Sequence, residues 1–109
     1  MATNSNVFTA ILQKLKGLFE MPKTEKYVNP EKIVVYGHSY CPGARRLRTA
    51  LEEKHVDFEW RDVKEGDPRF QGELKELARG YLSVPTVILQ DGTLMVEPYV
   101  SDVLQKINQ

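Results

Sequence analysis

Hydrophobic residues recur along this chain with two periods, which separate expected strands from expected helices. Four short runs are apolar, or alternate between apolar and polar residues, as is typical of strands: residues 32–36, 56–62, 83–89 and 93–96. Three longer runs place apolar residues three or four positions apart, as is typical of amphipathic helices: residues 42–54, residues 68–81 and a last run that ends at Ile107. The predicted order is therefore β-α-β-α-β-β-α.

Local signals indicate how these elements join into an α/β fold. A strand, a helix and a strand in close succession predict a parallel pair with a right-handed crossover. Asp91-Gly92 between two apolar runs predicts a hairpin. Asp67 is predicted to cap the second helix, with Pro68 as its first residue. One sheet with helices on both faces accommodates this order. The side chains predicted to face inward are Val56, Phe58 and Trp60 of the second strand and Phe70, Leu74, Leu77, Ala78 and Tyr81 of the second helix.

Residues 1–21 differ from the rest of the chain, and we interpret residues 6–20 as an amphipathic helix. Its apolar stripe comprises Val7, Phe8, Ile11, Leu12, Leu15, Leu18 and Phe19. Membrane-surface binding, partner binding, and packing on its own domain or on a second copy are all open; packing on protein is favoured. A homodimer through this helix is one such arrangement. Because Met21–Glu31 contains two prolines and reads as a connector, we divide the chain into residues 1–30 and a domain of residues 31–109.

The composition narrows the functional classes. Fifteen basic and fifteen acidic residues cancel, so we expect no nucleic-acid partner. No apolar run approaches membrane-spanning length, so we expect no membrane partner. A single cysteine allows no internal disulfide, and His38 and His55 do not complete a zinc ligand set with it, so no metal is expected. A cytoplasmic location fits these features.

Cys41, the only cysteine, lies between the first expected strand and its helix. Pro42 follows it, and proline is favoured at the first helical position, so Cys41 is expected at the N-cap. The amide N–H groups and the dipole at a helix start favour a thiolate. The alternative is an inert buried cysteine, which is common in proteins. The position at a strand-to-helix corner favours a reactive thiol.

Pro85 opens the third expected strand, where it removes a ladder donor. Proline at a strand start is tolerable on structural grounds alone. A functional interpretation is that Val84-Pro85 is a cis bond that leaves the Val84 backbone free for a bound chain. The pattern of residues alone leaves both interpretations open.

Residues 32–107 resemble a glutaredoxin, within the thioredoxin-like fold. Two motifs carry the resemblance, Ser39-Tyr40-Cys41-Pro42-Gly43-Ala44 after the first strand and Ser83-Val84-Pro85 before the third, and their spacing matches the family. The stretch from Val84 to Pro98 is most similar to the mycoredoxin branch. It lacks the paired glycines that glutathione-using relatives carry before the last helix. The resemblance implies a four-stranded mixed sheet.

The resemblance also implies roles for individual residues. Cys41 would be the nucleophile, and the substrate-binding residues would be His38, Tyr40, Pro42, Val84, Pro85, Ser101 and Asp102. Val84 would pair its backbone with the bound thiol, next to a cis Pro85. Ser101 and Asp102 would open the last helix and hold the γ-glutamyl group. His38 stands where relatives often carry a lysine that binds a carboxylate.

The main departure from the family is Ala44, where most relatives carry a second, resolving cysteine. A natural alanine and an engineered one look the same in the sequence. The expected function is a monothiol oxidoreductase that reduces mixed disulfides between protein cysteines and a small thiol, with no bound cofactor. Glutathione or another low-molecular-weight thiol would be the co-substrate, and thiol-modified proteins the partners. The alternative is a non-catalytic module that binds a peptide, a partner or an iron–sulfur cluster.

Overall fold

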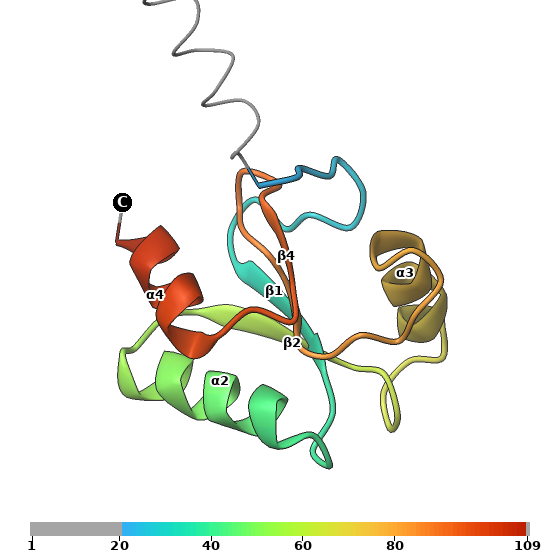
Figure 1. Ribbon diagram of the computed structural model, residues 1–109, viewed down its shortest axis with the longest axis horizontal. Helices are drawn as coiled ribbons and strands as arrows, with labels where there is room; N and C mark the ends of the chain where they lie inside the picture. Colours follow the sequence, from blue (N-terminus) through green and yellow to red (C-terminus); the bar gives the residue numbers. More distant parts are fainter. Residues whose placement is uncertain (1–20, 109) are drawn as a thin grey trace, which may run out of the picture.

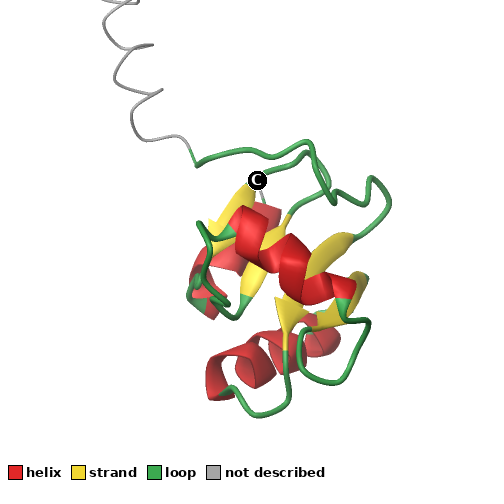
Figure 2. Ribbon diagram, turned by 90° about the vertical axis from the view of Figure 1, so that its right-hand side faces the viewer, coloured by secondary structure: helices red, strands yellow, loops and turns green. Residues whose placement is uncertain are grey.

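The computed structural model describes residues 21–108, which form a four-stranded sheet with helices on both faces (Figures 1 and 2). The elements are β1 (Ile33–Gly37), α2 (Pro42–Glu53), β2 (Phe58–Asp62), α3 (Arg69–Leu77), β3 (Thr86–Ile88), β4 (Leu94–Val96) and α4 (Val100–Ile107). This order confirms the predicted β-α-β-α-β-β-α fold. The helix predicted at residues 6–20 lies outside the described residues.

The sheet is mixed, with strand order β2-β1-β3-β4. β1 runs parallel to β2, with Val35 opposite Trp60, as a right-handed crossover through α2 requires. β1 pairs antiparallel with β3, where Val35 lies opposite Val87, and β3 continues into β4 through the hairpin at Asp91-Gly92. The central strands β1 and β3 are fully buried.

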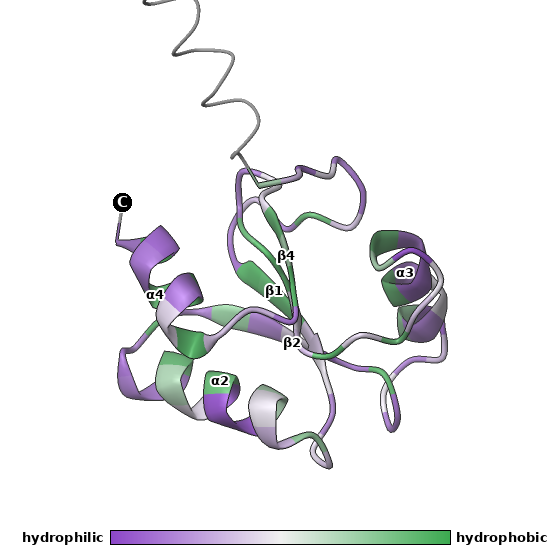
Figure 3. Cartoon of the chain, viewed as in Figure 1, coloured by the Kyte–Doolittle hydropathy of each residue, from purple (hydrophilic) through white to green (hydrophobic). Residues whose placement is uncertain are grey.

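Alternation along β1 divides the core between the two faces of the sheet. Ile33 and Val35 pack with Leu47 and Leu51 of α2 and Val103 of α4. Val34 and Tyr36 point the other way and pack with Leu74 of α3, among other residues. Figure 1 accordingly shows α2 and α4 on one side of the sheet and α3 on the other. Figure 3 shows hydrophobic residues along β1 and β4 and alternating hydrophilic and hydrophobic residues along α3. Among the described helices, none has the length and apolar character needed to cross a membrane.

The connector that begins at Met21 pairs through its backbone with the hairpin of β3 and β4. Lys23 forms a bridge with Thr93, the Thr24 N–H donates to the Gly92 carbonyl at 2.8 Å, and Leu94 N–H donates to the Pro22 carbonyl at 2.8 Å. Gly92 has φ +92°, and a Cβ there would lie 2.4 Å from the Thr24 carbonyl oxygen. Only glycine fits this turn, and its lack of a side chain lets the connector approach the hairpin closely.

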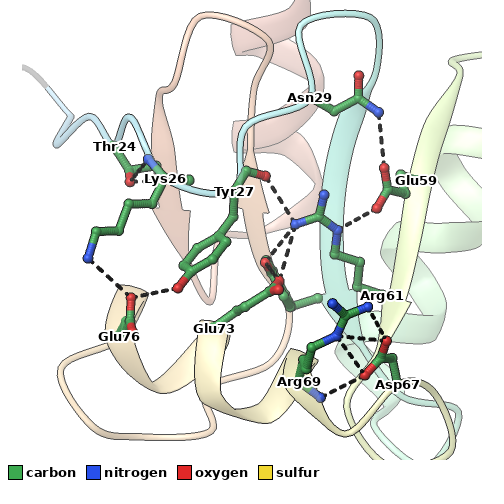
Figure 4. A network of polar contacts seen from close by, with 11 residues as sticks. Thr24, Lys26, Tyr27, Asn29, Glu59, Arg61, Asp67, Arg69, Glu73 and Glu76 are labelled. Atoms are coloured by element: carbon green, nitrogen blue, oxygen red, sulfur yellow. Dashed lines mark hydrogen bonds and ion pairs between the residues drawn. The ribbon is translucent and has the colours of Figure 1, made fainter.

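The same connector meets α3 through a polar network around Arg61, whose side chain is only 12% exposed (Figure 4). Its guanidinium pairs with Glu59 and Glu73 and donates to the Tyr36 hydroxyl at 2.7 Å and the Tyr27 carbonyl at 3.0 Å. Burial and the hydrogen bond to Glu73 raise the pKa of Tyr36, so its phenol stays protonated. The sequence pattern gave no indication of this network.

Several predicted boundaries and one predicted contact are wrong. The second helix begins at Arg69, with Pro68 at the N-cap, although the Asp67 carboxylate still accepts the Arg69 N–H at 2.9 Å. Tyr81 lies beyond the end of this helix and is 72% exposed. The reason is that the chain leaves the helix at Ala78 and turns at Gly80, which has φ +92°. The second, third and fourth strands are shorter than predicted and begin at Phe58, Thr86 and Leu94.

Candidate active site

Cys41 is the N-cap residue of α2, as predicted from Pro42. Its backbone is extended, so the side chain turns back over the first helical turn. The sulfur atom accepts a hydrogen bond from the Ala44 amide at 3.5 Å, and it lies 3.7 Å from the Val84 carbonyl oxygen. The residue as a whole is half-buried. The sulfur therefore lies between an amide donor of the helix start and a carbonyl acceptor of the Val84 segment.

Val84 and Pro85 form the opposite wall beside the thiol. The bond between them is cis, as predicted. A Cβ at Gly43 would lie 3.7 Å from Pro85 Cδ and 3.9 Å from the Cys41 sulfur. The two predicted motifs therefore meet across Gly43, a residue without a side chain. Within residues 21–108, the Val84 N–H donates to no other residue.

The segment before α4 lies next to Pro85. The Glu97 N–H donates to the Pro85 carbonyl at 2.8 Å, and Glu97 adopts φ +49°, a conformation that favours glycine. Tyr99 caps α4 and is 80% exposed. Ser101 and Asp102 were predicted to open the helix, but α4 begins at Val100, so both lie in its first turn.

Within that turn the two residues differ in what they can offer to a ligand. Ser101 is exposed. The Asp102 carboxylate accepts the Tyr99 N–H at 3.2 Å, so one of its oxygens closes the helix start. The placement is compatible with a ligand held at the exposed end of α4, and the predicted roles of both residues stay predictions.

Tyr40 and His38 flank the other side of Cys41. Tyr40 is 64% exposed, and its hydroxyl donates a hydrogen bond to the Glu65 carboxylate at 2.9 Å. This hydrogen bond raises the pKa of Tyr40. The centroids of the His38 and Tyr40 rings lie 6.2 Å apart. The backbone carbonyl of His38 accepts the Cys41 N–H at 3.3 Å. The His38 Nδ1 atom is buried and has no partner among the described residues.

These positions bring most of the predicted site residues together and add others. His38, Tyr40 and Pro42 adjoin Cys41 in the sequence, and Val84 and Pro85 reach it through space. Sequence reasoning missed Glu65 and Glu97, because neither stands in a recognisable motif and both join the site through contacts with distant residues. Within the described residues, no cluster of three or more His, Cys, Asp and Glu side chains could hold a metal ion.

Comparison with known proteins identifies the family and agrees with the fold. The family model for glutaredoxin matches residues 33–95. The crystal structure of the thioredoxin-like protein BC3987 is 30% identical to the chain, with a TM-score of 0.58, and the match covers 70% of this chain and 99% of that one. The glutaredoxin of Archaeoglobus fulgidus is 20% identical, with a TM-score of 0.61 and coverage of 72% and 87%, and therefore supports the fold alone. No curated protein matches the chain.

The family model spans more than half of the chain and includes the thiol, the cis-proline motif and the hairpin. The chain therefore belongs to the glutaredoxin family and has the thioredoxin-like fold. Glutaredoxin-like redox chemistry is the general function that this membership supports.

Proposed function

We propose that the protein is a monothiol oxidoreductase that removes a low-molecular-weight thiol from protein cysteines. The observation that carries the proposal is the position of the Cys41 sulfur. It accepts an amide hydrogen bond at the start of α2 and lies 3.7 Å from the Val84 carbonyl oxygen, and Gly43 leaves the space between the sulfur and Pro85 free of a side chain. A single cysteine in this setting can act as a nucleophile but has no partner thiol within its own chain.

The chemistry then takes two exchange steps. In the first, the Cys41 thiolate attacks the small-thiol sulfur of a mixed disulfide, the substrate S–S bond breaks, and a Cys41–small-thiol disulfide forms. The target protein leaves as a thiolate and takes a proton from water. In the second, a free small-thiol anion attacks the sulfur of the bound small thiol. A small-thiol disulfide leaves, and the Cys41 thiolate is restored.

The surrounding residues would position the small thiol for these steps. The Val84 N–H is available to pair with the backbone-like part of the ligand, and Pro85 would define one wall. Ser101, Asp102 and His38 would bind its polar ends. Pro42 and Tyr40 would line the entrance to the thiol. Such a cycle needs a reducing compartment with abundant small thiol, such as the cytoplasm.

Two kinds of small thiol are candidates for the co-substrate, and the segment before α4 bears on the choice between them. Glutathione is the usual co-substrate in this family, but Glu97 and Tyr99 occupy the segment where glutathione-using relatives carry paired glycines. The positive φ of Glu97 keeps the backbone shape that glycine would adopt, while its side chain adds a negative charge to this segment. Another low-molecular-weight thiol is therefore an equal candidate.

A turnover assay tests the proposal. A model protein whose cysteine is blocked by glutathione, or by another small thiol, is mixed with catalytic amounts of the enzyme and an excess of the same free thiol. We expect release of the protein thiol over many cycles, with a rate that depends on the free-thiol concentration. Cys41→Ser should abolish release while keeping the fold. A wild-type protein that releases no thiol from any of the blocked proteins would refute the proposal and favour the non-catalytic alternative.

A further inference from the structure

A groove of about 580 Å³ runs along the surface of α2 that faces away from the sheet. Pro42 lines one end of it, so the groove begins at the residue after Cys41. Val100 of α4 forms part of the wall, and Thr49 and Ala50 are small side chains midway along α2. This groove lies apart from Val84 and Pro85, which would hold the small thiol.

Positive and negative side chains line opposite ends of the groove. Arg45 and Arg46 line it near the thiol, and Glu53 lines it two turns further along α2. The Arg45 guanidinium donates to the Ser39 carbonyl at 3.2 Å, which holds it close to the Cys41 loop. Arg46 is exposed and pairs with no carboxylate within residues 21–108. The end of the groove nearest the thiol is therefore positive.

The distances of these charged residues from Cys41 can be compared with the length of an extended peptide bound along the groove. With a rise of about 1.5 Å per helical residue, the Cα atoms of Arg45 and Arg46 lie about 6–8 Å along the axis from that of Cys41, and the Cα atom of Glu53 lies about 18 Å from it. A peptide advances about 3.3 Å per residue when extended. Those distances correspond to about two residues and about five residues from the cysteine under attack.

We propose that this groove binds the protein half of the mixed disulfide and selects targets with an acidic residue about two positions from the modified cysteine. The inference rests on the proposed function, because it assigns the leaving half of that substrate. Charge complementarity selects the occupant. The chain's own N-terminal segment is a poorer fit, since its first nineteen residues carry lysines and no acid.

Single-turnover reactions of the reduced enzyme with short synthetic peptides test this assignment. Each peptide carries a central cysteine joined to glutathione or, in a second set, to free cysteine, with either aspartate or lysine two positions to each side. We expect the wild type to release the acidic peptide about fivefold faster than the basic one at low ionic strength, with the difference shrinking as salt is added. Arg46→Glu should remove or reverse the preference.

Lys75→Glu is the matched control, because it makes the same charge change on an exposed position of α3, across the sheet from the groove. It should keep the preference of the wild type. Equal rates for both peptides with the wild type would overturn the groove assignment and leave the proposed function standing. An equal loss of preference in both variants would also overturn it, because total charge would then be the cause. Release of neither peptide in either set would refute the proposed function and, with it, the groove assignment.

Discussion

Gly43→Ala should make the protein more stable and less active, because Gly43 is the open side of the thiol. The added methyl group would lie 3.9 Å from the Cys41 sulfur and 3.7 Å from Pro85 Cδ. Both are ordinary van der Waals distances, so the folded chain can accept the methyl group without moving. The same methyl group would occupy the space through which a substrate sulfur has to approach.

The two effects have different sizes. Replacing a helical glycine by alanine reduces the entropy of the unfolded chain and raises the free energy of unfolding by about 0.5–1 kcal/mol. For a domain of this size, that raises the melting temperature by about 2–8 °C. A displacement of the substrate sulfur by a fraction of a methyl diameter should slow the exchange with a mixed disulfide about tenfold, because attack geometry is strict.

Gly72→Ala provides the matched control. Gly72 lies on α3, and a Cβ there would meet nothing within 4 Å. It should give a similar gain in stability, measured by urea unfolding followed through the fluorescence of Trp60, the only tryptophan. Its rate of thiol exchange should equal that of the wild type. Our reasoning would be refuted by a Gly43→Ala variant that exchanges at the wild-type rate, or by one that is less stable than the wild type.

Three further changes probe the fold and the thiol. Arg61→Met removes a nearly buried cation from two carboxylates and should lower the free energy of unfolding by about 3 kcal/mol. Arg69→Met, which removes an ion pair whose arginine side chain is 83% exposed, should change the urea midpoint little. The ion pair with Arg61 lowers the pKa of Glu59 below its usual 4.5, so the stability it contributes is present above that pH and is lost as pH falls through the folded pKa. Glu59→Gln should flatten this acid dependence of unfolding, and an unchanged slope would exclude Glu59 as its source. Ala44→Cys places a second thiol one helical turn from Cys41 and should form an internal disulfide on mild oxidation, which thiol titration would register as a loss of both free groups; two remaining thiols would contradict this placement.

The sequence predicted those parts of the fold and site that depend on local signals. Pro42 after a β-branched strand predicted the N-cap position of Cys41. Proline is favoured at the first helical position because its fixed φ suits a helix and its missing N–H would have no partner there, and both causes are local. Asp91-Gly92 predicted the hairpin for the same kind of reason. The resemblance to glutaredoxins then indicated that Val84-Pro85 would meet the thiol, which periodicity could not show.

The parts that were missed depend on contacts between distant segments. Arg61 joins the connector to α3 across more than thirty residues of sequence, and no periodic pattern encodes such a pairing. The prolines of residues 21–31 indicate a connector, but no local signal shows that Thr24 pairs with Gly92. Tyr81 continued the helical spacing of α3, but the turn at Gly80 ended the helix and left its ring in solvent.

The most direct test of the central claim is the mass of the first covalent intermediate. The reduced protein is mixed with one equivalent of a target protein blocked by a small thiol, quenched with acid and measured intact, and the modified residue is then located by peptide mapping. If Cys41 attacks as proposed, the enzyme gains the mass of one small thiol on Cys41, and the target regains its free thiol. An enzyme that stays unmodified, or that carries the target protein on Cys41 in place of the small thiol, would contradict the account.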